Sequence, residues 1–323
     1  MKTAVTGAAG FIGTNLVNLL VENGHEVVAI DRAVPSTPET REAVTWVSGD
    51  VLDLSSMTKA LDGVEVVYHL VAVITLKHED ELCWRINTEG ARTVAQAALA
   101  VGARRMVHCS SVDSYSNSVT TINEEAPRST GADLPVYQRS KWGGEVAVRE
   151  VIESGLDAVI GNPTGVYGPV DLPNLSRINK LLFDSARGRL PAMVDSKYDL
   201  VDARDVAAGL YLAGEKGRTG ENYLLGGHLG SLLQVCRQAA QHVGKRGPRF
   251  AVPVSLLTAA VPVLEPIGKL LKQEGLNRVA IKKLTVSAAM DITKARTELG
   301  YDPRSTETTV TELVDFFVSS GRL

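Results

Sequence analysis

Lys2-Thr3-Ala4-Val5-Thr6-Gly7-Ala8-Ala9-Gly10-Phe11-Ile12-Gly13, at the start of the chain, is the most informative stretch of the sequence. The apolar run over residues 3–6 predicts a buried strand, and the apolar spacing after Gly13 predicts a helix. Glycines at spacing Gly-x-x-Gly-x-x-Gly between a strand and a helix indicate a dinucleotide site. Gly7 would permit the turn, Gly10 would leave room for a pyrophosphate, and Gly13 would let helix and strand pack closely. The alternative is a strand-to-helix turn in another kind of α/β protein.

The alternation of elements extends this pattern along the chain. Apolar runs bounded by turn residues alternate with helical patterns, which predicts a doubly wound α/β fold with a parallel sheet and helices on both faces. The predicted strands are residues 3–6, 26–30, 44–47, 64–70, 105–109 and 157–160, and the later predicted helices are 55–61, 87–100 and 137–154.

Regularity falls after Gly168, where prolines become frequent. We therefore expect two parts: a dinucleotide-binding domain of residues 1–168 and 198–230, and a smaller substrate-binding lobe of residues 169–197 and 231–323. Residues 200–206 and the helix after them are expected to return to the large sheet.

The amino-acid composition limits which kinds of partner the protein can have. The chain has 323 residues, of which 44% are hydrophobic and 22% charged, which is typical of a globular protein. Its net charge of −3 predicts no nucleic-acid partner. The apolar stretch 251–271 is interrupted by prolines and charges, so we expect buried helices or a lid there and no membrane span.

The cysteines and the N-terminal residues indicate the cellular compartment. Cys83, Cys109 and Cys236 have no paired spacing, which predicts neither a disulfide framework nor a metal site and fits a cytoplasmic protein. The predicted first strand occupies the N-terminus, so we expect no signal peptide.

Asp31 ends the second predicted strand, about twenty residues after the glycines. An acid at this place can accept hydrogen bonds from the adenosine ribose hydroxyls and would repel a 2′-phosphate, which predicts NAD as the cofactor. Arg32 could instead hold a phosphate, so NADP is the alternative. Asp31 could also be a residue that only caps a turn.

Tyr137 and Lys141 are four residues apart on a predicted helix and therefore share a face. An ammonium near a phenol lowers the phenol's pKa and makes it usable for proton transfer. Ser110, Ser111 and Pro163 follow predicted strands, and ligands of parallel sheets bind at the carboxyl ends of strands. The alternative for the pair is an exposed Tyr–Lys contact on a helix surface.

These motifs together make the sequence resemble the extended short-chain dehydrogenases/reductases, the NAD-dependent epimerase/dehydratase superfamily, over nearly the whole chain. The matching motifs are residues 6–13, Gly49-Asp50-Val51, His69-Leu70-Val71-Ala72, Asn87-Thr88-Glu89-Gly90, Ser110-Ser111, Tyr137-x-x-x-Lys141, residues 162–169 and residues 291–301.

The resemblance implies roles for individual residues. Ser111 would hydrogen-bond the substrate oxygen, Tyr137 would be the acid/base, and Lys141 would hold the nicotinamide ribose. The further cofactor contacts that it implies, from the pyrophosphate through the adenine and the loop over the cofactor to the nicotinamide, are Phe11, Ile12, Asp50, Val51, Leu70, Val71, Ala72, Asn87, Ser110 and Pro163.

The resemblance also implies a homodimer that pairs through the helices beginning near Asn87 and Tyr137. The small side chains of Ala91, Ala95 and Ala98 would suit close helix approach.

Within the superfamily, residues 191–206 and 215–227 resemble dihydroflavonol-reductase-like proteins. This predicts NAD(P)-dependent interconversion of a ketone or aldehyde and an alcohol on a small-molecule substrate. Asn162 occupies a position where some epimerases contact substrate, so a sugar-nucleotide epimerase or dehydratase is the alternative. Asp199 departs from the asparagine that is frequent in reductase-like relatives. A non-catalytic cofactor-sensing protein is a third possibility, although such proteins usually lack the tyrosine or the lysine.

Overall fold

The computed structural model describes residues 1–34, 41–116, 118–171, 175–253, 255–256, 259–260, 262 and 288–323. Its largest sheet has seven strands in the order β11-β7-β5-β4-β1-β2-β3, and every neighbouring pair is parallel. The predicted doubly wound α/β fold is confirmed. The strands are β1 (Lys2–Thr6), β2 (Glu26–Asp31), β3 (Val44–Ser48), β4 (Val66–His69), β5 (Arg105–Cys109), β7 (Ala158–Pro163) and β11 (Asn222–Leu225).

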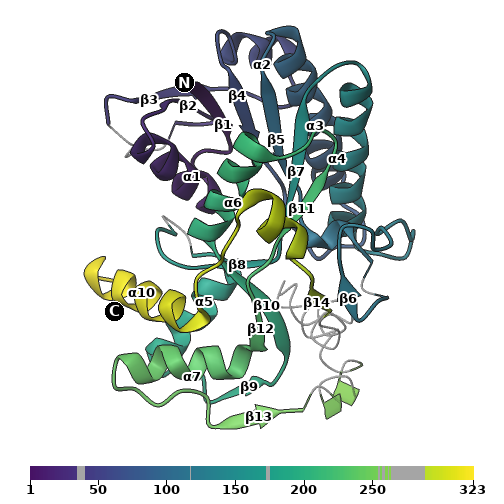
Figure 1. Ribbon diagram of the computed structural model, residues 1–323. Coiled ribbons are helices and arrows are strands. Elements are labelled where there is room, and N and C mark those ends of the chain that lie inside the picture. Colours follow the sequence, from purple (N-terminus) through teal and green to yellow (C-terminus); the bar gives the residue numbers. More distant parts are fainter. Residues whose placement is uncertain are drawn as a thin grey trace.

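Helices cover both faces of this sheet (Figure 1). On one face α1 (Phe11–Glu22) packs beside α6 (Ala203–Lys216), and their apolar side chains join those of the strands in one core cluster. On the other face lie α2 (Leu54–Ala60), α3 (Glu81–Ala100) and α4 (Val136–Glu153). Because both faces are buried, most side chains of the central strands are apolar, as the sequence pattern predicts.

A smaller lobe lies below the large sheet in Figure 1. Strands β8 (Gly165–Tyr167), β10 (Lys197–Asp202) and β12 (His228–Ser231) form a three-stranded sheet. Helices α5 (Arg177–Ala186), α7 (Leu232–His242) and α10 (Thr306–Ser319) contribute to its separate core. Two short parallel pairs complete the described elements: β9 (Ala192–Val194) with β13 (Phe250–Val252), and β6 (Thr121–Ile122) with β14 (Ala289–Met290).

Some boundaries differ from the sequence predictions. β10 does not join the large sheet but pairs with β8 and β12, and the chain returns to the large sheet through α6 and β11. Helix α3 begins at Glu81 rather than at Asn87, because the Asp80 side chain caps it by accepting a hydrogen bond from the Cys83 N–H at 3.0 Å. Most of residues 251–271, expected to form buried helices or a lid, lie outside the described residues.

Within the described ranges, no helix is both long and apolar enough to cross a membrane. The same part of the chain holds no group of three or more His, Cys, Asp or Glu side chains arranged to bind a metal ion. Cys83, Cys109 and Cys236 are buried free cysteines.

Candidate active site

The glycine turn between β1 and α1 requires glycine at two positions for different reasons. Gly7 has φ +76°, a left-handed conformation that side chains disfavour. A Cβ on Gly13 would lie 2.1 Å from the Gly7 carbonyl oxygen, so the helix can meet the turn only without a side chain there. No side chain caps the N-terminus of α1. This geometry fits a bound pyrophosphate, because the helix end with its positive dipole stays accessible to an anion.

A cavity of about 230 Å³ lies over this turn, at the carboxyl ends of the strands. The predicted cofactor residues that line it are Gly7, Gly10, Asp31, Arg32, Val51, Leu70, Val71 and Ala72. Sequence reasoning did not single out its other lining residues, which are Thr6, Ile30, Gly49, Val73, Leu82 and Ile86. The cavity therefore gathers segments from four strand ends into one site suited to a dinucleotide.

Asp31 joins the end of β2 to the glycine turn. Its carboxylate accepts hydrogen bonds from the backbone N–H of Ala9 at 3.3 Å and of Arg32 at 2.8 Å. The Asp31 side chain therefore caps the turn, which was the alternative role considered from the sequence, and it also lines the cavity.

Asn87 lies behind the cavity wall instead of lining it. Its side-chain oxygen accepts from the Val73 N–H at 2.8 Å, and its amide donates to the Val73 carbonyl at 3.0 Å and to Ser140 Oγ at 2.9 Å. Asn87 is buried and therefore holds the loop that follows β4 in place.

The remaining predicted cofactor residues occupy three other places. Phe11, Ile12 and Gly13 form the first turn of α1, and Pro163 is buried at the end of β7. Asp50 is exposed, and its carboxylate accepts from the Leu52 N–H at 2.9 Å.

The structure brings Ser111, Tyr137 and Lys141 together at the carboxyl edge of the sheet, and all three are buried. The Ser111 hydroxyl is close enough to the Tyr137 phenol to lower its pKa. The Asp113 N–H donates to Ser111 Oγ at 3.1 Å. Lys141 Nζ donates to the carbonyl of Cys109 at 2.9 Å. A phenol, a hydroxyl and an ammonium therefore meet where β5 ends and α4 begins.

Burial dominates the titration of both helix residues. It raises the pKa of the Tyr137 phenol, the Asp113 carboxylate raises it further, and the Ser111 hydroxyl opposes this. Burial also lowers the pKa of the Lys141 ammonium. The net direction for Tyr137 is opposite to the one expected from the Tyr–Lys spacing, because burying a phenolate is costly and the charge of Asp113 disfavours it as well.

Several polar residues near this site were not predicted. Glu145 is fully buried one helical turn beyond Lys141, and its spacing on the same helix face was a signal that could have found it. Gln138 Nε2 donates to Asp113 Oδ1 at 3.3 Å. The negative charge of Asp113 also raises the pKa of Tyr198 on β10, so Asp113 lies near the smaller lobe.

Asn162 and Asp199 are both engaged within the protein. Asn162 is fully buried, and its amide donates to the Ser111 carbonyl at 3.1 Å. Asp199 Oδ1 accepts from Thr164 Oγ1 at 2.7 Å and from the Gly227 N–H at 2.8 Å. Asn162 therefore supports the Ser111 turn, which differs from the substrate contact that the epimerase alternative would need.

A family model described as "NAD dependent epimerase/dehydratase family" matches residues 3–226, about two thirds of the chain. The chain belongs to this family. The match covers the glycine turn, the Ser–Tyr–Lys site and the large sheet through β11.

Two similar proteins and one solved structure match the chain over nearly its full length. Sterol demethylase protein B of Methylococcus capsulatus is 32% identical, with 100% of both chains covered. A putative dihydroflavonol 4-reductase of Synechocystis is 30% identical over 98% of this chain and 94% of that protein. The crystal structure of gox2253 superposes with a TM-score of 0.85 at 31% identity, covering 99% of each chain. This family member is thus an enzyme with the oxidoreductase and epimerase relatives that its sequence predicts.

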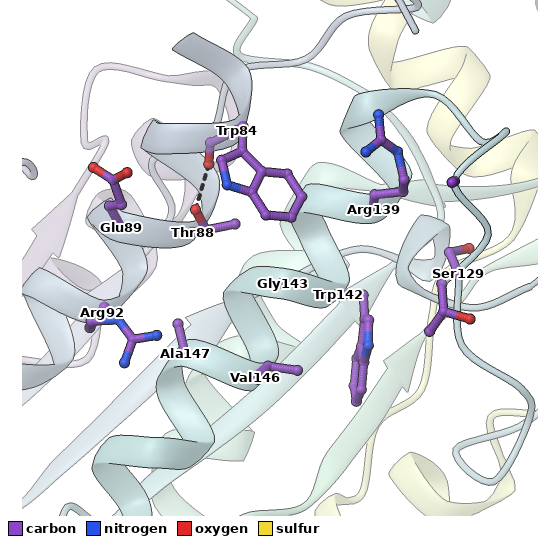
Figure 2. A pocket seen from close by; sticks show the side chains of 12 residues that line it. Trp84, Thr88, Glu89, Arg92, Ser129, Arg139, Trp142, Gly143, Val146 and Ala147 are labelled. Carbon is purple, nitrogen blue, oxygen red and sulfur yellow. Dashed lines mark hydrogen bonds between the residues drawn. The ribbon is translucent and has the colours of Figure 1, made fainter. Parts of the chain in front are cut away.

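The outer face of α3 and α4 forms a second hollow, separate from the active site. A groove of about 590 Å³ runs between the two helices, with Trp84 and Thr88 on α3 and Trp142 and Gly143 on α4 (Figure 2). Trp84 is 41% exposed. Ala91, Ala95 and Ala98, expected at a dimer contact, are fully buried against the chain's own core. Their small size therefore serves packing within the chain, and these three residues are not available for a contact with a second chain.

Proposed function

We propose that the enzyme interconverts a ketone or aldehyde and the corresponding alcohol by hydride transfer with NAD. The observation that carries this proposal is that Ser111, Tyr137 and Lys141 are all buried at the carboxyl edge of the sheet, on which a dinucleotide cavity also lies. The nicotinamide supplies the hydride donor or acceptor when the cofactor is bound.

The chain's own residues would manage the proton. Ser111 Oγ accepts from the Asp113 N–H, which leaves its hydroxyl proton free to be donated to the substrate oxygen. Tyr137 Oη would give its proton to that oxygen in reduction and take it back in oxidation. Because burial keeps the phenol protonated, the unliganded enzyme is prepared to act as an acid. Lys141 would hold the nicotinamide ribose and offset charge on the phenolate.

Three substitutions test these roles. Tyr137→Phe should lower turnover by roughly 10²- to 10⁴-fold and spare cofactor binding, because only the phenolic oxygen is lost. Lys141→Met should lower both turnover and cofactor affinity. Ser111→Ala should slow turnover and spare cofactor affinity. Full activity of Tyr137→Phe would refute the mechanism even though the fold stands.

The assay substrates follow from the names of the relatives. A 3β-hydroxysterol and a dihydroflavonol, each with NAD(H) and NADP(H), form the first panel, since the similar proteins are named for sterols and dihydroflavonols. We infer that residues 169–197 and 231–323 form the lobe that selects among them. Turnover of a sugar nucleotide without net cofactor change would instead support the epimerase alternative.

We propose that NAD binds more tightly than NADP. Asp31 lines the cavity at the end of β2, where its carboxylate would accept ribose hydroxyl hydrogen bonds and repel a 2′-phosphate. Fluorescence titration with both cofactors measures the preference. NADP binding about tenfold tighter than NAD, a difference of about 1.4 kcal/mol, would show that Arg32 determines the choice instead.

We further propose a cytoplasmic homodimer that pairs through the groove between α3 and α4. Beside this groove, another hollow of about 440 Å³ lies along the same two helices and is lined by Gln96 and Leu99 among others. The surface is therefore extended enough for a second copy. The buried free cysteines fit a reducing compartment. Trp84→Glu should give a monomer in light scattering, while Val318→Glu, at a position on α10 that is 51% exposed, should not. A wild-type protein that is monomeric at micromolar concentration would overturn this proposal.

A further inference from the structure

Glu145 is a fully buried carboxylate on α4 that accepts hydrogen bonds from several elements. Its Oε1 accepts from Ser110 Oγ at 2.6 Å, from Ser114 Oγ at 2.7 Å and from Asn162 Nδ2 at 2.7 Å. Ser110 and Ser114 lie on either side of the catalytic Ser111 turn. One carboxylate oxygen is therefore hydrogen-bonded to both ends of that turn.

The other oxygen makes an ion pair. Arg128 donates to Glu145 Oε2 at 3.0 Å, and Asn222 Nδ2 on β11 donates to the same oxygen at 2.9 Å. The Arg128 guanidinium lies over the Tyr115 ring at 3.8 Å and near the Trp142 ring at 4.8 Å. All five of these side chains donate to the carboxylate, so each of its oxygens is matched as an acceptor.

These contacts connect the two halves of the proposed active site. Tyr137 and Lys141 project from the same helix as Glu145, whereas Ser111 belongs to the turn after β5. Residues four apart share a helix face, so Lys141 and Glu145 both point toward the sheet edge. The hydrogen bonds to Ser110 and Ser114 then set how far the Ser111 hydroxyl stands from the Tyr137 phenol.

We propose that Glu145 is a positioning residue, which holds the Ser111 turn against the helix of Tyr137 and Lys141 in the geometry needed for turnover. This inference rests on the proposed function of those three residues. It assigns to Glu145 no contact with substrate or cofactor.

Glutamine at this position cannot reproduce the arrangement. Its amide nitrogen is a donor, and it would face donors whichever way the side chain is turned. The turn would move away from α4, and a displacement of about 1 Å in reacting groups can cost about 100-fold in rate. We therefore expect Glu145→Gln to lower kcat by about 10- to 100-fold and to change substrate KM by less than about threefold.

Movement of the Ser111 hydroxyl away from the phenol would also change the pH profile. The Ser111 hydroxyl lowers the pKa of Tyr137, while burial and the charges of Asp113 on the following turn, Cys109 on β5 and Cys83 on α3 raise it. A further charged group is Lys141, one turn away from Tyr137 on the same helix. The limb of the kcat profile that reports Tyr137 should therefore move to higher pH in Glu145→Gln.

The matched control is Glu153→Gln, the same change on the same helix at an exposed position. Ser114→Ala is the second test variant, because it removes one donor to Glu145 and keeps the Arg128–Glu145 ion pair, although Ser114 Oγ also accepts from Arg128 at 3.4 Å and from Asn162 at 3.3 Å. It should lower kcat by about three- to tenfold with little change in thermal midpoint. This variant decides the matter if Glu145→Gln does not fold.

The assay uses the full-length NAD-bound enzyme and the sterol or dihydroflavonol of the panel that the wild type turns over. Folding is checked by circular dichroism at the assay temperature. Wild-type kcat and pH profile in folded Glu145→Gln, or unchanged kcat in Ser114→Ala, would overturn the positioning role. Tyr137→Phe is run in parallel: if it stays active, the proposed function fails, whereas its inactivity beside an active Glu145→Gln refutes only the present inference.

Discussion

Two buried histidines should make the fold sensitive to mild acid. His69 ends β4 and His108 lies beside it on β5, with stacked rings whose centroids are 5.4 Å apart. His69 Nδ1 lies 2.7 Å from Thr6 Oγ1. Among the described residues, His69 Nε2 and both ring nitrogens of His108 have no hydrogen-bond partner. No carboxylate of the described residues affects the titration of either ring, so nothing there stabilises its charged form.

Both pKa values fall as a result. Burial first, and then the Lys141 ammonium, lowers the pKa of His69 to about 3. The same causes and the neighbouring His69 lower the pKa of His108 well below its usual range. In the unfolded chain each would titrate near 6.5. Below that pH the unfolded state binds more protons, so stability is complete above pH 6.5 and falls as the pH decreases.

The size of the effect follows from proton linkage. Each histidine costs about 1.4 kcal/mol of unfolding free energy per pH unit below 6.5. At pH 5 the pair should therefore cost about 4 kcal/mol, a large share of the 5–15 kcal/mol that is typical of a folded domain. His108→Leu should remove about half of this loss, since neither ring nitrogen of His108 has a partner to be missed.

Urea unfolding followed by circular dichroism between pH 7.5 and pH 5, roughly the window in which histidine titrates, measures the slope. His78→Asn is the control, because the His78 side chain is 56% exposed and should not contribute. An equal pH slope in wild type and His108→Leu would refute the reasoning, and an equal reduction in His78→Asn would show that the effect is not specific to burial.

Further predictions concern a buried carboxyl and the glycine turn. Burial raises the pKa of Asp199, so the ionised side chain weakens the fold above about pH 4. Asp199→Asn should therefore raise the melting temperature at pH 7. It should not do so at about pH 3.5, which lies below the usual aspartate pKa. Gly13→Ala should cost about 1–3 kcal/mol and abolish NAD binding, because its Cβ would meet the Gly7 carbonyl, as denaturant unfolding and fluorescence titration would show. Gly230→Ala, whose Cβ would have no neighbour within 4 Å, should leave stability and NAD affinity unchanged.

Local features of the active site were predictable because they depend on short stretches of backbone. The spacing of Gly7, Gly10 and Gly13 indicates a turn between a strand and a helix without reference to the rest of the chain. Tyr137 and Lys141 share a face because the period of an α-helix places them there. The alternation of apolar runs likewise predicted the parallel sheet, whose central strands are buried on both faces.

What the sequence pattern left undetermined depends on contacts between distant segments. Ala91, Ala95 and Ala98 form an alanine-rich helix face, but periodicity cannot say whether that face meets the sheet or a second chain, and the fold turns it inward. The direction of the Tyr137 pKa shift also follows from burial, which a helix pattern does not contain. The partners of Glu145 lie from 17 to 77 residues away along the chain, so only packing of α4 against β5, β7 and β11 brings its donors together.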